Sequence, residues 1–207
     1  MKLANRIGII DYGMGNLRSV GKAIERLGGS VYVGSDPAVL KRLDKLVLPG
    51  VGAFGDAMAE LKKRKLIALL TDANHQGKKI LGICLGLQLF FERSAESPKT
   101  KGLGFWKGRV PRFSKSAKNL KIPHMGWNQV DFRQKSKLTA NIKNNSFFYF
   151  VHSYYGKPID QKLVVGKTKY GILFPSVLAS ENVFAVQFHP EKSQKAGLQI
   201  LKNFINL

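Results

Sequence analysis

Short apolar runs alternate with amphipathic stretches through the first half of the chain. The apolar runs have the length and composition of buried strands, which we expect at 6–11, 31–33, 45–48 and 79–83. The intervening stretches repeat apolar residues at helical spacing, which predicts helices at 16–27, 36–43, 55–74 and 85–93. This alternation indicates an α/β fold with a doubly wound, mostly parallel sheet flanked by helices.

The pattern changes after Ser94. Lysine- and serine-rich connectors separate short strands that we expect at 147–152, 163–167 and 183–188. Strands joined in this way favour hairpins, so we predict an antiparallel extension of the sheet, closed by a final helix at 194–205. The chain shows no repeat or linker, and residues 1–207 are therefore expected to form a single domain.

Composition narrows the class of protein. The only cysteine is Cys84, so no internal disulfide can form, and a cytoplasmic location fits best. The apolar stretch after Lys2 and Arg6 is too short for a signal peptide, and no run approaches the roughly 18 apolar residues of a membrane span.

The net charge of +21 is the unusual feature of the composition, because such a surface attracts polyanions. The basic residues are nevertheless scattered, in runs at 62–65, 115–121 and 135–137, and no nucleic-acid-binding motif accompanies them. We therefore expect a solvated basic surface, or one that faces an acidic partner, and no specific nucleic-acid binding.

A candidate nucleophile follows the fourth predicted strand. Residues 82–86 read Gly-Ile-Cys-Leu-Gly, the cysteine form of the nucleophile elbow, in which small residues relieve crowding at a tight strand-to-helix turn. The helix start also places free N–H groups and a positive dipole beside Cys84, which favours the thiolate. The alternative is a buried structural cysteine, a common fate of a lone Cys.

A candidate base lies near the end of the chain. His189, Pro190 and Glu191 follow an apolar strand, and residues two apart in an extended chain project to the same side. An imidazole beside Cys84 can move its proton, while Glu191 orients the ring. A solvated turn at the strand end is the alternative; together with the elbow, the tripeptide indicates a Cys84-His189-Glu191 triad.

Acyl-transfer chemistry also needs donors for an oxyanion. The backbone N–H of Leu85 follows the nucleophile and is one candidate. The loop 49–52, Pro-Gly-Val-Gly, is flexible enough to supply a second donor from Val51 or Gly52. An ordinary turn is the alternative for this loop.

Taken together, these motifs resemble the class I (triad) glutamine amidotransferases, and more narrowly the glutaminase subunits of imidazole glycerol phosphate synthases. The resemblance extends over nearly the whole chain and includes Gln88 and the segments at 11–16, 123–128, 150–154 and 192–193. It implies that Cys84 attacks the carboxamide of glutamine, that ammonia leaves, and that water hydrolyses the glutamyl thioester. It also implies that Gly52 and Gln88 hold glutamine and that Ser153 and Tyr154 line the pocket.

The same resemblance implies a heterodimer in which ammonia passes to a (β/α)8-barrel cyclase subunit in histidine biosynthesis, with no cofactor. Candidates for the partner-facing surface are Asn16, Trp127, Tyr149 and Lys192. The alternative for Trp127 is a position in the core, and the alternative for Lys192 is an ordinary solvated lysine. His124 and His152 lack metal-ligand spacing, so we interpret both as structural and expect no metal site.

Three rival functions stay open from the sequence. A paralogous amidotransferase subunit would supply ammonia to another synthetase, for example in modified-sugar biosynthesis. A binding protein without catalysis would use its basic face on a polyanion, with steep salt dependence. A Cys-His peptidase of related architecture is disfavoured by Gln88 and by the run 151–154.

Overall fold

The computed structural model of the protein describes residues 6–114 and 120–207, so residues 115–119 of the basic run at 115–121 lie outside it. One nine-stranded sheet dominates, with strand order β2-β1-β3-β4-β12-β11-β10-β7-β8. The five strands from β2 to β12 are parallel neighbours, whereas β11, β10, β7 and β8 pair antiparallel. The predicted fold class, including the antiparallel extension, is confirmed.

The first-half elements follow the predicted alternation closely. They are β1 (Arg6–Ile10), α1 (Leu17–Arg26), β2 (Ser30–Gly34), α2 (Pro37–Lys41), β3 (Lys45–Gly50), α3 (Phe54–Lys63), α4 (Leu66–His75), β4 (Lys79–Cys84) and α5 (Leu85–Leu89). The helical region predicted at 55–74 consists of two helices, because Lys65 adopts a left-handed backbone with φ of 57° between them.

The helix predicted at 85–93 is also wrong in its length. The chain leaves the helix at Phe90, and Phe91 enters β5 (Phe91–Ser94), which pairs with β6 (Trp106–Val110) in a small second sheet completed by β9 (Lys157–Pro158). Phe90 and Phe91 both pack edge-on against Trp106, and this aromatic contact overrides the helical pattern.

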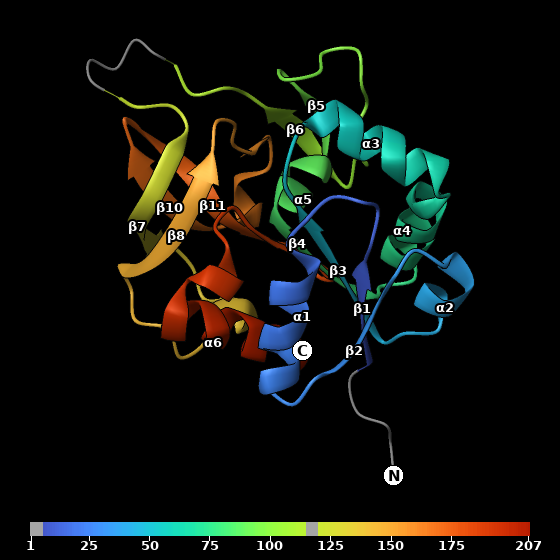
Figure 1. Ribbon diagram of the computed structural model, residues 1–207. Helices are drawn as coiled ribbons and strands as arrows, with labels where there is room; N and C mark the ends of the chain where they lie inside the picture. Colours follow the sequence, from blue (N-terminus) through green and yellow to red (C-terminus); the bar gives the residue numbers. More distant parts are fainter. Residues whose placement is uncertain (1–5, 115–119) are drawn as a thin grey trace.

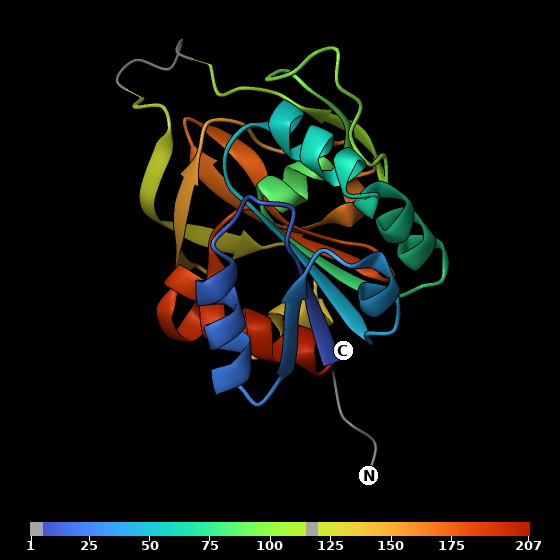
Figure 2. The same cartoon turned by 45° about the vertical axis from the view of Figure 1, so that its right-hand side comes forward.

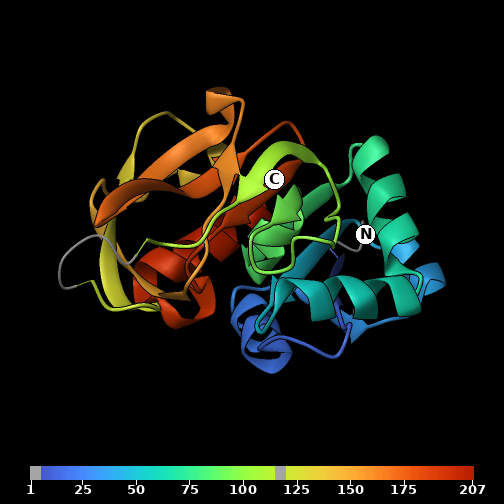
Figure 3. The same ribbon diagram turned by 90° about the horizontal axis from the view of Figure 1, so that it is seen from above.

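The second half adds β7 (His124–Phe132), β8 (Ser146–His152), β10 (Val164–Tyr170), β11 (Ile172–Ala179), β12 (Val183–Val186) and α6 (Gln194–Ile205), with short 3-10 turns η1 (Lys137–Thr139), η2 (Gln161–Leu163) and η3 (Pro190–Lys192). Strands β5, β6, β7, β9 and β11 were not among the predicted strands. Seen from above, the yellow and orange antiparallel strands occupy one end of the molecule and the blue and teal elements the other (Figure 3).

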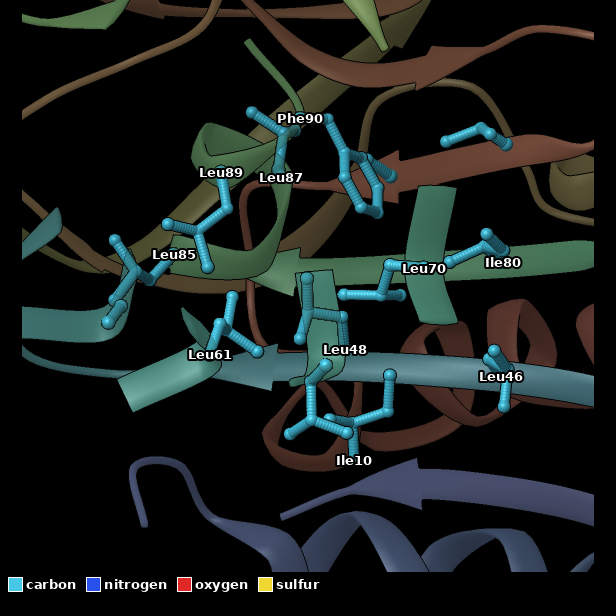
Figure 4. Packing of buried hydrophobic residues seen from close by; sticks show 14 of the residues in the cluster. Ile10, Leu46, Leu48, Leu61, Leu70, Ile80, Leu85, Leu87, Leu89 and Phe90 are labelled. Carbon is cyan, nitrogen blue, oxygen red and sulfur yellow. The ribbon is translucent and has the colours of Figure 1, made fainter. Parts of the chain in front are cut away.

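Two apolar layers hold the sheet. On one face α1 and α6 contribute Ile24 and Phe204 to a cluster with Val47 of β3. On the other face α2 to α5 pack over Leu46 and Leu48, the neighbours of Val47 (Figures 1 and 2). Figure 4 shows this second layer from close by. Successive side chains of a strand point to opposite faces of the sheet. A strand that is covered on both faces therefore needs apolar residues at successive positions, and its sequence is a continuous apolar run.

Candidate active site

The turn between β4 and α5 is the sharpest feature of the site. Cys84 has φ of 55° and ψ of −107°, a backbone conformation that L-residues rarely adopt and that costs about 1–3 kcal/mol. The elbow expected at 82–86 is therefore present, with the nucleophile candidate at the end of the parallel part of the sheet. Cys84 is 5% exposed and is a free thiol.

The two flanking glycines are required by close backbone approach. A Cβ on Gly86 would lie 1.9 Å from the carbonyl oxygen of Leu48 in β3. A Cβ on Gly82 would lie 2.5 Å from the ring of Phe90. Any side chain at either position would push the elbow away from the sheet, so the Gly-x-Cys-x-Gly spacing is a packing requirement of this turn.

Strand register brings the other candidate segments to Cys84. Gly50 of β3 is the direct neighbour of Cys84, so Val51 and Gly52 follow beside the elbow. Pro49 and Gly50 thus belong to β3, and the expected loop at 49–52 begins only at Val51. On the other side of β4, Val186 of β12 pairs with Ile83. The chain continues from Val186 to His189, which therefore lies at the same edge of the sheet as Cys84.

His189 and Glu191 form a buried pair. Nδ1 of His189 lies 2.9 Å from Oε1 of Glu191, and the two side chains are 3% and 1% exposed. Burial alone would lower the pKa of His189, but interactions with Cys84 and Glu191 outweigh it and raise the pKa to about 10. Nε2 of His189 is buried without a hydrogen-bond partner among the described residues, and His189 lines the same cavity as Cys84.

Ser193 fastens this pair to the antiparallel part of the sheet. Its hydroxyl donates to the carbonyl of His189 at 2.6 Å and accepts from the N–H of Tyr149 at 2.9 Å. The N–H of His189 in turn donates to the carbonyl of Tyr149. Two hydrogen bonds to Tyr149 of β8 and one between the residues that flank η3 therefore fix the backbone that carries the imidazole.

A cavity of about 350 Å³ opens above the elbow. Its lining includes eight of the predicted residues: Val51, Gly52, Cys84, Leu85, Gln88, Ser153, Tyr154 and His189. The size matches the lower end of small-molecule sites. Residues at 51–52, 84–88, 153–154 and 189 are far apart in the chain, and the fold brings them together as the motifs predicted.

Three further polar residues lie at this site, and of these only Tyr12 falls within a segment, 11–16, that carries the resemblance. Glu96 lines the cavity and accepts from the N–H of Phe54 at 2.7 Å. Tyr12 lies under the cavity loop, where its hydroxyl donates to the carbonyl of Pro49. Gln187 is fully buried with Nε2 at 3.8 Å from the sulfur of Cys84. Its position two residues before His189 in an extended chain was the available signal.

His152 and His124 lie behind the cavity in a buried hydrogen-bond chain. His152 Nδ1 is 2.7 Å from the Tyr154 carbonyl, and His124 Nδ1 is 3.0 Å from His152 Nε2. Burial lowers the pKa of His152 to about 3 and that of His124 to about 4, so both rings are neutral at ordinary pH. No group of three or more potential metal ligands occurs within residues 6–114 and 120–207.

Three of the four partner-surface candidates lie together. Trp127 of β7 meets Tyr149 of β8 edge-on at 6.1 Å, and Nζ of Lys192 lies 5.9 Å from the centre of the Tyr149 ring. Trp127 is 46% exposed, so it is not a core residue. Asn16 precedes α1, which lies against η3.

Comparison with known proteins accounts for this arrangement. The sequence matches the family Glutamine amidotransferase class-I over residues 9–207. It is 50% identical over 200 residues to "Imidazole glycerol phosphate synthase subunit HisH" of Aquifex aeolicus, covering 96% of this chain and 95% of the relative. The chain belongs to the class I glutamine amidotransferases, among the HisH subunits of imidazole glycerol phosphate synthase.

Other HisH subunits are similar to the same degree. The subunit of Bacillus subtilis is 45% identical over 204 residues, covering 97% of this chain and 96% of the relative. That of Moorella thermoacetica is 48% identical over 198 residues, covering 96% and 93%. The predicted activity, a glutaminase subunit that serves histidine biosynthesis, is confirmed by this membership.

Solved structures show how widely this amidotransferase fold is shared. A structure described as "Crystal structure of glutamine amidotransferase" has a TM-score of 0.75 at 17% identity and covers 97% of this chain and 99% of its own. The PurLQS structure from Thermotoga maritima has a TM-score of 0.76 at 20% identity, with 99% of both chains covered. Within the part of this amidotransferase that the structure describes, none of the helices is long and apolar enough to cross a membrane.

Proposed function

We propose that Cys84, His189 and Glu191 are the catalytic triad of this glutaminase subunit. The observation that carries the proposal is the strained elbow at Cys84 in the same cavity as His189, whose ring is held by a buried Glu191. Strain of this kind persists only where the surrounding structure enforces it, and it is concentrated at functional sites.

The protonation state of His189 determines the order of the chemical steps. Because interactions with Cys84 and Glu191 raise the pKa of His189 to about 10, the imidazole is protonated at neutral pH. The nucleophile in this proposal is the thiolate form of Cys84. The thiolate attacks the carboxamide carbon of glutamine, and the C–N bond then breaks as His189 gives its proton to the leaving ammonia. The now neutral ring takes a proton from water, which attacks the thioester and releases glutamate.

Glutamine binds, in this proposal, within the cavity over the elbow. Gln88 and Gly52 hold the substrate, Ser153 and Tyr154 line its pocket, and the developing oxyanion accepts from the N–H of Leu85 and from a second N–H at Val51 or Gly52. Gly52 has φ of 88°, and Val51 is 43% exposed, so this segment is the least constrained part of the lining. A rotation of the Val51 peptide would switch the second donor on or off.

The ammonia passes to a partner subunit, which we propose is a (β/α)8-barrel cyclase in a heterodimer. The relatives are subunits of a synthase, so a partner is implied by the family. Trp127 and Lys192 are exposed and contact the half-buried Tyr149 of β8, the strand that ends at the cavity residue His152. Asn16 lies at the start of a helix packed on η3. These four residues are the proposed contact surface.

We further propose that residues 1–207 act as one domain in the cytoplasm, without a metal, a cofactor or specific nucleic-acid binding. Both apolar clusters pack on the same nine-stranded sheet, which supports the single domain. The unpaired thiol of Cys84 needs a reducing environment, which supports the location.

The test is release of glutamate from glutamine by the purified chain, alone and with a candidate cyclase subunit and its ribonucleotide ligand. Low activity alone, a large rise with the liganded partner and none for Cys84→Ala would support the proposal. Full activity of Cys84→Ala would exclude the triad. A wild-type chain that hydrolyses glutamine but ignores the cyclase would exclude this partner and leave the triad intact.

A further inference from the structure

Gln187 occupies a position that the triad mechanism does not explain. It follows β12, it is fully buried, and its backbone N–H donates to the Ser176 carbonyl. Its side-chain amide bridges two parts of the site: Oε1 lies 3.3 Å from Nε2 of Gln88, and Nε2 lies 3.8 Å from the sulfur of Cys84. A buried carboxamide has two donors and two acceptor positions to satisfy, so these contacts define its role.

A single carbonyl determines which end of this amide faces Cys84. The Tyr154 carbonyl can only accept, so Gln88, whose Nε2 is 3.0 Å away, must turn its NH2 group towards it. The same NH2 group then donates to Gln187, which must present its oxygen. The NH2 end of Gln187 is left facing the sulfur of Cys84.

The same carbonyl orients His152, and the hydrogen bonds of His152 agree with this assignment of donors and acceptors. Its Nδ1 donates to Tyr154, so its Nε2 accepts from His124, and the neutral state of both rings agrees with this arrangement. The Tyr154 carbonyl is thus an acceptor for two donors, one from β8 and one from α5.

We propose that Gln187 is a further functional residue of this site, which donates to the Cys84 thiolate through Nε2 and holds the Gln88 side chain through Oε1. The proposal rests on the proposed role of Cys84 as the nucleophile. Gln187 is then a second stabilising group at the sulfur besides His189, and it links the sulfur to Gln88, which is proposed to bind glutamine.

The surroundings of the sulfur provide a different partner for each protonation state. The Val151 carbonyl lies 3.8 Å from Sγ and can accept from a neutral thiol but offers nothing to a thiolate. Gln187 does the opposite, because its N–H group gains most from a negative sulfur. A hydrogen bond to a buried charged group shifts the equilibrium between thiol and thiolate by about tenfold or more.

The sole cysteine of the chain provides a direct readout. Iodoacetamide alkylates the thiolate, so the alkylation rate as a function of pH reports its population in the purified full-length chain without requiring glutaminase activity. The titratable groups that influence this readout within the described residues are Tyr12 after β1, His152 at the end of β8, Glu96 in the cavity wall, and the His189–Glu191 pair.

Two variants separate the two ends of the amide. Gln187→Met keeps the length of the side chain and removes both contacts, whereas Gln187→Glu keeps an oxygen towards Gln88 and removes the donor to the sulfur. We expect both to raise the pH of half-maximal alkylation, by about one unit or more for Gln187→Met. In the partner-activated glutaminase assay, Gln187→Met should lower kcat by about tenfold with a smaller rise in KM.

Thr168→Val is the matched control, because it removes another buried side-chain hydrogen bond, to the Ser176 hydroxyl, but leaves the Ser176 carbonyl that accepts from the Gln187 N–H. Neither Thr168 nor Ser176 lines the cavity. It should lower stability to urea and leave the alkylation profile unchanged. A wild-type alkylation profile for folded Gln187→Met would overturn the inference, and Gln187→Glu carries the same test if the Met variant does not fold. Loss of glutaminase in Cys84→Ala alongside such a result would leave the triad standing.

Discussion

The hydroxyl of Tyr12 donates a 2.9 Å hydrogen bond to the carbonyl of Pro49, and this bond ties the loop after β1 to the end of β3. Burial, reinforced by the nearby Cys84, raises the pKa of Tyr12 well above its ordinary value, so the hydroxyl remains a donor. Because Val51 and Gly52 follow Pro49 directly, Tyr12 anchors the base of the proposed oxyanion segment.

Removing this hydroxyl should affect both stability and activity. Tyr12→Phe leaves the Pro49 carbonyl buried without its partner, which costs about 1–3 kcal/mol of unfolding free energy. We also expect lower glutaminase activity, since the loop loses its anchor. Urea unfolding and the partner-activated assay measure the two effects. Tyr170→Phe is the control: its hydroxyl bonds to the exposed Lys121 carbonyl, which water can satisfy, so equal losses in both variants would contradict the prediction.

Loss of the carboxylate of Glu191 should change the pH dependence of the site. Glu191→Gln removes an interaction that raises the pKa of His189, so imidazolium is lost at lower pH and glutamine hydrolysis falls roughly 10²- to 10⁴-fold. NMR titration of the His189 ring checks the direction of the shift. An unchanged titration in the variant would show that Glu191 does not act on the ring.

The same pair should make stability depend on pH. The pKa of folded His189, about 10, lies above the unfolded value near 6.5, so its contribution is complete below pH 6.5 and is lost as the pH rises through about 10. The difference in unfolding free energy between wild type and Glu191→Gln should therefore shrink between pH 6.5 and pH 10. Urea unfolding over this range measures it, and a difference that grows with pH would contradict the assignment.

The elbow glycine should tolerate no side chain. In Gly86→Ala the new methyl group would lie 1.9 Å from the Leu48 carbonyl oxygen, so we expect either an unfolded chain or a loss of several kcal/mol. Gly21→Ala is the matched substitution, in α1, where the nearest atom is an ordinary 3.6 Å away. It should be neutral or stabilising by up to about 1 kcal/mol. Thermal unfolding of both variants measures these changes in stability. A Gly86→Ala variant as stable as the wild type would contradict the prediction.

Trp127 should matter for the complex more than for the free chain. It is 46% exposed and lies at the surface against Tyr149, so Trp127→Ala leaves no enclosed cavity and should cost the free chain less stability than truncation of a core aromatic residue. Binding of a cyclase subunit should weaken by more than about 1 kcal/mol if the residue is an interface anchor. Ile159→Ala, at a residue 72% exposed that follows β9 in the small second sheet, serves as the control in the same titration. Equal affinities for wild type and Trp127→Ala would remove this residue from the proposed surface.

Much of the fold could be predicted because its strands are buried on both faces. The runs at β1, β3 and β4 are continuously apolar, so their period and type are visible locally. The strand β7 is harder to recognise, because it alternates exposed and buried residues and contains Gly126 and Asn128. Whether such a stretch becomes a strand depends on its partner, here β8, which the local pattern does not identify.

The sequence by itself determined the nucleophile elbow and the His-Pro-Glu tripeptide, because each depends on the backbone needs of neighbouring residues: glycine where the turn crowds a strand, and two side chains on one side of an extended segment. Only the tertiary structure decided the extent of α5, the break at Lys65 and the position of Gln187 against Cys84. The end of α5 depends on the contacts of Phe90 and Phe91 with Trp106. The position of Gln187 depends on the register between β4 and β12 and on the hydrogen bond that Gln88 donates to the Tyr154 carbonyl. All of these are contacts between residues distant in the chain, which no local stretch of sequence specifies.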